Sequence, residues 1–391
     1  MSHIRASQKK GPKMELLFLK ILFIDIIGGG SGRLFELFGG LTIRYVLFFI
    51  GLLLVFCKLS FSTIYIRRNE LIAFILGTFF IPIGMVTMAT NDLSLAMADL
   101  KPFFFFALFF LILGQNENNS QILLEKFCKY LLVIPFIMGV IQIIILLLIN
   151  YGVLPFPAFY AYAETTSSEI MFRGEDGYFF YKGFFFLGLG FVYAYIRGKK
   201  ILAAFLILCI FLSQTRGLLL ASIFTVCLHL MLTARKQTAF LLFILSPVAI
   251  FIIYMLIMKI LFLREDAGDS NSVRFKDGAY ILAENTFLQN IVGNGWGSEI
   301  NGRARLENIF MEIFFKTGFP GLLSSLVLTV YVFISSKTKY NPFVYLMFFS
   351  FIVSQTNPFI FTPMGIILTG VCILSCRYYY NRDGTLQTTT T

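Results

Sequence analysis

One arginine stands out in this sequence because of where it lies. Arg216 falls in a short polar turn, Ser213 to Gly217, between two strongly apolar runs. An unpaired guanidinium is costly at such a position, so Arg216 is expected to meet an anion. Because the planar guanidinium suits a diphosphate or a carboxylate, the turn predicts an anion pocket at a membrane surface. The alternative is an interfacial anchor whose charged end reaches lipid headgroups.

Further basic side chains occur in and beside two long polar stretches, residues 151–178 and 263–306. Loops of this length are usually functional or disordered. The candidates in this group are Arg173, Lys182, Arg264, Arg274, Arg303 and Arg305. Acidic residues lie among them without the spacing of an EF-hand loop, so we interpret the acidic residues as a solvated face.

Glu307 lies where the second polar stretch re-enters an apolar run, and Asn308 follows it. A carboxylate held near arginines could act as a general base. The simpler alternative is that the positive end of a helix dipole favours a carboxylate at this position. Glu312 and Lys316 are four residues apart and are predicted to neutralise one another on one helix face.

Residues 293–298 read G-N-G-W-G-S and contain the only tryptophan of the chain. Glycines at this spacing allow tight turns and close approach of backbones. Trp296 offers a flat apolar face, which could stack on a sugar ring or anchor the chain at the membrane interface.

The elements that must position these residues are membrane helices. The chain has 391 residues, of which 58% are hydrophobic and 14% charged, and its mean hydropathy is +0.81. Repeated apolar runs predict one all-α, polytopic integral membrane domain, residues 1–391, with roughly twelve transmembrane helices. The predicted spans are about 14–27, 41–58, 70–90, 100–114, 127–150, 178–197, 200–214, 216–234, 238–262, 307–335, 342–356 and 358–377.

Charge distribution predicts which side of the membrane each loop faces. With a cytoplasmic N-terminus, every predicted inner loop carries Lys or Arg. The same alternation places both long stretches and the Arg216 turn on the outer side. The net charge of +11 is therefore explained by membrane topology, and no nucleic-acid partner is expected.

Several kinds of chemistry have little support on the outer side. His3 and His229 fall in the basic leader and near the inner end of a helix, which disfavours Ser/His/Asp catalysis and a His-ligated metal. The six cysteines lie in or beside apolar runs without zinc-site spacing. Walker A and dinucleotide-binding motifs are absent from the sequence. We expect neither a metal nor a cofactor.

Taken together, residues 170–335 resemble the O-antigen polymerase and O-antigen ligase family of bacterial envelope enzymes. Residues 211–217 are similar to the family's S-x-S-R-G turn, and a further matching piece is Arg274 followed about twenty residues later by the glycine-rich segment 293–297. Residues 307–321 are similar to its H-N-x-x-L helix entrance with two later glycines. Arg173, followed by Gly174, resembles the arginine of the family's earlier outer loop.

The resemblance implies a GT-C-like, metal-independent glycosyltransferase in the bacterial inner membrane with its active site facing the periplasm. Its substrate would be a glycan on undecaprenyl diphosphate, with membrane lipid around it and a chain-length regulator protein as a further partner. Arg216, Arg274 and Glu307 would then be catalytic. The substrate-binding residues would be Arg173, Lys182, Arg264, Trp296, Arg303, Arg305 and Asn308.

One departure from the family pattern bears on the choice between its two activities. Where ligases carry His before Asn, this chain has Glu307, which weakens the ligase interpretation and is compatible with a polymerase. A flippase or other transporter for lipid-linked oligosaccharides is the alternative from another class. It predicts ionisable residues deep in several helices and internal symmetry, whereas charge here gathers at one face.

Overall fold

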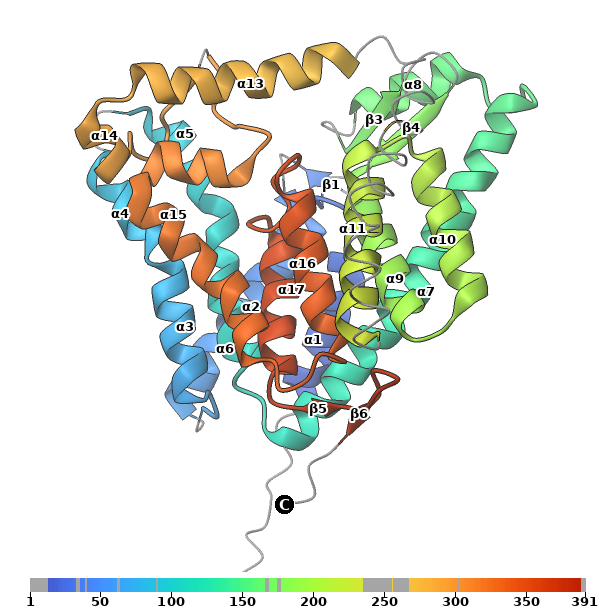
Figure 1. The fold of residues 1–391 in the computed structure, drawn as a ribbon, viewed down its shortest axis with the longest axis horizontal. Coiled ribbons are helices and arrows are strands. Elements are labelled where there is room, and N and C mark those ends of the chain that lie inside the picture. The colour runs from blue at the N-terminus through green and yellow to red at the C-terminus, as the bar shows by residue number, and fades with distance from the viewer. Residues whose placement is uncertain are drawn as a thin grey trace, which may run out of the picture.

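The computed structural model shows a bundle of helices, most of them running in roughly one direction, with one helix lying across one end (Figure 1). It describes residues 13–32, 36–38, 41–61, 64–88, 91–165, 169–173, 177–234, 255, 267–300 and 302–387. Within these residues the chain is mostly helical, and its strands form three two-stranded antiparallel hairpins. The prediction of a mostly helical, multi-pass membrane protein is confirmed.

Helices along the bundle account for most of the chain. They are α1 (Lys13–Gly28), α2 (Ile43–Phe61), α3 (Arg68–Thr78), α4 (Phe80–Val86), α5 (Leu93–Leu100), η2 (Lys101–Leu108), α6 (Phe109–Ile112), α7 (Glu117–Asn150), η3 (Lys182–Phe184), α9 (Phe185–Ile196), α10 (Lys200–Leu212), α11 (Arg216–Thr233), α15 (Ile309–Ser335), α16 (Pro342–Val353) and α17 (Pro363–Ser375). The hairpins are β1 (Glu36–Phe38) with β2 (Leu41–Thr42), β3 (Ile170–Arg173) with β4 (Tyr178–Tyr181), and β5 (Tyr379–Tyr380) with β6 (Leu386–Gln387).

Six helices or helix series among the described residues are long and apolar enough to cross a membrane, and four shorter ones are apolar. Eleven of the predicted spans coincide with helices for most of their length. The twelfth, about 238–262, lies outside the described residues apart from residue 255. The full count of twelve therefore stays a prediction.

Both long polar stretches carry regular structure. The first contains α8 (Phe156–Thr165) and the strand β3, and the second contains α13 (Ala267–Glu284) and α14 (Phe287–Val292). These elements lie at the same end of the molecule, where α13 runs across the bundle, and β5 and β6 lie at the other end (Figure 1). The shared location agrees with the predicted placement of both stretches on one side.

The expected helix at 178–197 begins later than predicted. Residues 178–181 form strand β4, paired with β3 in the register Arg173 to Tyr178 and Ile170 to Tyr181. Aromatic residues such as those of the Y-F-F-Y segment favour strands, and the pairing satisfies the backbone groups that a helix would otherwise satisfy. The helix proper, α9, starts at Phe185.

Two cations predicted to mark inner loops are buried in ion pairs near the end that carries β5 and β6. Lys58 Nζ lies 2.6 Å from Glu15 Oε2, and Arg377 Nη2 lies 2.5 Å from Glu70 Oε2. All four side chains are less than a tenth exposed. Buried charges require such partners, so these residues connect helices as well as marking one side of the membrane.

A break in α15 connects the second polar stretch to the helices. At Gly318 the backbone has φ 68° and ψ −170°, which interrupts the helix. The carbonyl oxygens of Phe315 and Lys316 instead accept hydrogen bonds from the backbone N–H groups of Asn294 and Gly295, each at 2.9 Å. The glycine-rich segment thus approaches the helix backbone closely, as its composition predicts.

Replacing Gly318 with alanine is expected to destabilise this junction. The backbone conformation at Gly318 is essentially restricted to glycine, and a Cβ there would collide with the Ile291 carbonyl oxygen. A loss of about 1–3 kcal/mol in stability is expected from backbone strain alone. Thermal unfolding of the detergent-purified protein measures it.

Gly152→Ala is the matched control, because Gly152 also has a positive φ, 70°, but no other atom lies within 4 Å of a Cβ built there. Gly318→Ala should lower the melting temperature more than Gly152→Ala. Equal decreases in melting temperature for the two variants would show that close packing at Gly318 contributes nothing to stability.

Candidate active site

Helix α13 is fixed across the end of the bundle by its inner face. Contrary to the predicted solvated face, the Asp277 carboxylate is buried and forms an ion pair with Arg303. Helix α13 also packs in a small apolar cluster with α15 and with the loop between α14 and α15. The cluster's buried members are Ile281, Ile300, Leu306 and Phe315. These contacts hold α13 in place. Arg274 lies on the same helix, about one turn before Asp277.

The central contact of the candidate site joins Arg274 to Glu307. The Arg274 Nη2 atom lies 2.5 Å from Glu307 Oε2 and 3.4 Å from the carbonyl oxygen of Thr356. The two side chains are 29% and 39% exposed, so both can be reached from solvent. The structure therefore brings together a predicted general base and a predicted anion-binding arginine that lie near opposite ends of the second polar stretch.

Arg216 begins α11 beside the same Thr356. Thr215 is the N-cap of this helix, and Gln214 before it adopts a positive φ of 49°. A Cβ built on Gly217 would lie only 2.5 Å from Thr356 Oγ1, so the backbone next to Arg216 is in close contact with that residue. The Arg216 side chain is partly buried. The Arg274 side chain and the backbone next to Arg216 thus contact the same turn of the chain, residues 354–357.

Asn308 connects the start of α15 to the same turn. Its side-chain oxygen accepts hydrogen bonds from the N–H groups of Phe310 and Met311 at 3.0 and 3.2 Å, which caps the helix. Its Nδ2 donates to Gln355 Oε1 at 3.1 Å. Asn308, predicted to bind substrate, is therefore engaged in capping α15 and in a contact with residues 354–357.

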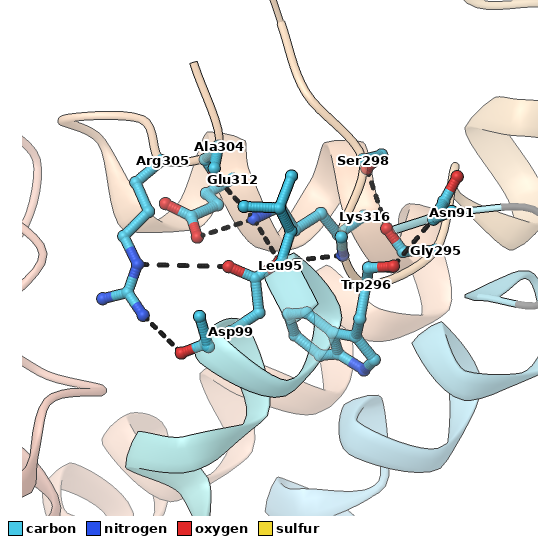
Figure 2. A network of polar contacts seen from close by, with 12 residues as sticks. Asn91, Leu95, Asp99, Gly295, Trp296, Ser298, Ala304, Arg305, Glu312 and Lys316 are labelled. Atoms are coloured by element: carbon cyan, nitrogen blue, oxygen red, sulfur yellow. Dashed lines mark hydrogen bonds and ion pairs between the residues drawn. The ribbon is translucent and has the colours of Figure 1, made fainter. Parts of the chain in front are cut away.

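The buried cation Lys316 connects the loop that precedes Glu307 to helices α5 and α15 (Figure 2). Lys316 Nζ lies 2.7 Å from Asp99 Oδ2 and 3.2 Å from Glu312 Oε1, and it donates to the Ala304 carbonyl oxygen at 2.6 Å. The predicted neutralisation of Glu312 by Lys316 is confirmed, and Asp99 joins it from α5. Asp99 Oδ2 also accepts from the Gly297 N–H at 2.9 Å, and Glu312 Oε2 from the Leu306 N–H at 3.0 Å.

Trp296 does not have the accessible face predicted for binding a sugar. The side chain is 1% exposed and packs against Phe80 and Phe103. Its indole N–H donates to the Ile81 carbonyl oxygen at 2.8 Å. Because the glycines on either side bring this segment deep between helices, Trp296 serves as a packing residue that anchors the loop.

Arg303 and Arg305 lie in the predicted loop but hold contacts within the protein. Arg303 pairs with Asp277, as described above. Arg305 Nη2 donates to the Ala98 carbonyl oxygen at 2.6 Å, and its Nε lies 4.0 Å from Asp99 Oδ1. Both side chains remain more than a third exposed. Their placement fits a role in holding the loop beside α5 and α13.

Lys182 belongs to the other polar stretch, directly after β4. Its backbone N–H donates to the Glu169 carbonyl oxygen at 3.0 Å, and the buried Glu169 carboxylate accepts from the hydroxyl of Ser31 at 2.8 Å. The Tyr181 hydroxyl donates to the Gly28 carbonyl oxygen at 2.8 Å. Its pKa is raised, first by burial and then by the negative charge of Glu169, so the hydroxyl keeps its proton. The hairpin is thereby attached to the end of α1.

Two predicted site residues cannot be placed in the same way. The backbone of Arg173 ends β3, but its side chain lies outside the described part of the structure. Arg264 lies wholly outside it. Among the residues that the structure describes, no group of three or more His, Cys, Asp and Glu side chains could hold a metal ion. Metal independence stays a prediction.

Comparison with known proteins identifies the family. No family model matches the chain. The O-antigen polymerase of Shigella flexneri is 32% identical to it over 366 residues, which cover 92% of this chain and 94% of that protein. The chain belongs to the O-antigen polymerase family. The resemblance inferred from the motifs is confirmed.

Two parts of the site in this O-antigen polymerase family member are not among the predicted residues. One is the turn Ser354-Gln355-Thr356-Asn357, whose signal is a polar S-Q-T-N run on the predicted outer side between two apolar spans. The other is Asp99, an acidic residue at the end of α5 that directly precedes the apolar run 102–113. Sequence spacing alone could not pair Asp99 with Lys316, which lies 217 residues away.

Replacing Lys316 with methionine is expected to destabilise the protein strongly. The substitution leaves the Asp99 and Glu312 carboxylates buried without their shared cation, and breaking a buried pair typically costs about 3–5 kcal/mol. Thermal unfolding in detergent, combined with protease sensitivity of the 293–306 loop, measures the effect.

Arg305→Ala serves as the comparison, because Arg305 is half exposed and 4.0 Å from Asp99. An exposed pair of this kind contributes about 0–1 kcal/mol. A melting temperature for Lys316→Met as high as that for Arg305→Ala would contradict the assigned importance of the buried cation.

Proposed function

We propose that this protein is an O-antigen polymerase that transfers an undecaprenyl-diphosphate-linked glycan onto the next lipid-linked repeat unit. The reaction is proposed to occur at the periplasmic face of the bacterial inner membrane, on a GT-C-like scaffold. The observation that carries the proposal is the meeting of Arg274, Glu307 and the Arg216 turn at residues 354–357. The similarity to the Shigella flexneri O-antigen polymerase supports it.

The proposed reaction is a single displacement. A hydroxyl oxygen of the acceptor sugar forms a bond to the anomeric carbon of the donor, while the bond from that carbon to the diphosphate oxygen breaks. The hydroxyl proton passes to the Glu307 carboxylate, which is partly exposed and stands at the entrance of α15. Such a displacement inverts the anomeric configuration.

Arginines are proposed to stabilise the leaving group. The diphosphate gains negative charge as its bond to the sugar breaks, and preorganised guanidinium groups are well suited to bind it. Arg274 is already oriented by Glu307 and Thr356. In this proposal Arg274 contacts both the base and the leaving group, and Arg216, whose neighbour Gly217 lies against Thr356, is the second cation. The reaction requires no metal.

The hairpin and the second loop are proposed to select the glycan. Arg173 and Lys182 belong to the hairpin region, at the same end of the molecule as α13 (Figure 1). Arg264 precedes α13 in the sequence. These basic residues would contact the lipid diphosphate or the attached sugars. A chain-length regulator protein is proposed as an additional partner.

Loss of polymer is the expected result of changing the proposed catalytic residues. Cells that lack the chromosomal gene receive Arg216→Ala, Arg274→Ala or Glu307→Gln at equal protein level, and surface glycan ladders are compared. Removing a general base or a preorganised charge partner typically lowers the rate by about 10²–10³-fold. Each variant should leave lipid capped by a single repeat unit.

Lys276→Ala is the control, because this exposed residue shares α13 with Arg274 but lies on its outer side. It should give full-length ladders. Full-length ladders from all three site variants would contradict the site. Accumulated polymer that is not attached to lipid A core would indicate a ligase, and repeat units retained on the inner side would indicate a transporter.

A further inference from the structure

The turn formed by residues 354–357 connects three segments that are far apart in the sequence. Ser354 accepts from the Ile309 N–H through its carbonyl oxygen at 3.3 Å, and Gln355 accepts from Asn308 at 3.1 Å. Thr356 accepts from Arg274 at 3.4 Å and lies against Gly217. The turn therefore contacts the residue after the proposed base, the side chain of Arg274, and Gly217 next to Arg216.

Residues 355–357 of the turn are polar and partly exposed, whereas the apolar residues before and after the turn are buried. Phe359 and Val353, on either side, are buried, whereas Gln355, Thr356 and Asn357 are partly exposed. The Ser354 hydroxyl accepts from the Ile360 N–H at 3.0 Å, which closes the turn internally. Exposed neutral groups on a rigid turn can contact a ligand at little entropic cost.

Gln355 is the member of the turn whose side chain contacts the start of α15, next to the proposed base. It contacts Asn308, the residue after Glu307, and its Nε2 lies 3.4 Å from the Phe351 carbonyl oxygen. A glutamine side chain carries two N–H donors and two acceptor lone pairs, of which these contacts use one each. The remaining groups match a sugar hydroxyl, which both donates and accepts.

We propose that Gln355 binds the acceptor sugar and places its attacking hydroxyl beside Glu307. Thr356, the next residue of the turn, contacts Arg274 and lies against Gly217, so the donor diphosphate is placed at Thr356 and the acceptor sugar at Gln355. A neutral amide suits a sugar hydroxyl, whereas a diphosphate forms stronger hydrogen bonds with charged partners such as arginine. The proposal rests on the polymerase function proposed above and adds the residue that distinguishes acceptor from donor.

The test uses two substrates that can each play only one role. The donor is the host's repeat unit on a short polyprenyl diphosphate, with its acceptor hydroxyl methylated. The acceptor is the same repeat unit attached to an alkyl chain by a bond that cannot leave as diphosphate. Purified full-length wild type, Gln355→Met and Gln121→Met are assayed in detergent micelles, and kcat and both KM values are measured.

Gln355→Met retains side-chain length without hydrogen-bonding groups. It should raise the acceptor KM about tenfold, the loss of roughly one hydrogen bond, with donor KM and saturating kcat within about twofold of wild type. Gln121, near the start of α7, contacts only Glu125 on its own helix among the described hydrogen bonds. Gln121→Met should leave all three constants unchanged.

Other results separate the two proposals. A Gln355→Met protein with the wild-type acceptor KM would overturn the acceptor subsite while leaving the polymerase function intact. Equal rises in both KM values, or a fall in kcat together with a lower melting temperature, would show that Gln355 only supports the fold and would also overturn it. Absence of any transfer product with the wild type would instead contradict the polymerase function.

Discussion

Backbone hydrogen bonding in apolar surroundings is the constraint on which this structure depends. Where α15 is interrupted, the carbonyl oxygens of Phe315 and Lys316 lose their helical partners, and in a membrane protein such groups must be satisfied by other protein groups. Asn294 and Gly295 supply the N–H donors. The interruption and the glycine-rich segment therefore require one another.

The buried cation Lys316 also stabilises this junction. Lys316 is 1% exposed and draws Asp99 from α5 and Glu312 from its own helix into one cluster. Those carboxylates in turn receive backbone N–H groups of Gly297 and Leu306, at both ends of the loop segment that precedes Glu307. The loop is thus fixed at several points before it reaches the candidate active site, where Glu307 meets Arg274.

The sequence predicts the scaffold better than the contacts within it. Apolar runs locate most helices because burial in a bilayer requires such runs, and the order of motifs indicates the family and brings attention to Arg216, Arg274 and Glu307. Pairings between distant residues leave no trace in local periodicity, so Asp99 and Gln355 are not predicted. The burial of Trp296 is not predicted either, because composition does not show whether an aromatic ring faces a ligand or packs between helices.

The buried Trp296 has a consequence for how members of this family could diversify. A segment that fills a gap between helices cannot change freely, since each substitution would have to preserve shape, backbone approach and the indole hydrogen bond to Ile81. Variation in the glycans handled by related proteins is therefore expected outside the G-N-G-W-G segment. The outer surface of α13 and the β3–β4 hairpin can accept new side chains without repacking the bundle, so evolutionary change in specificity should concentrate there.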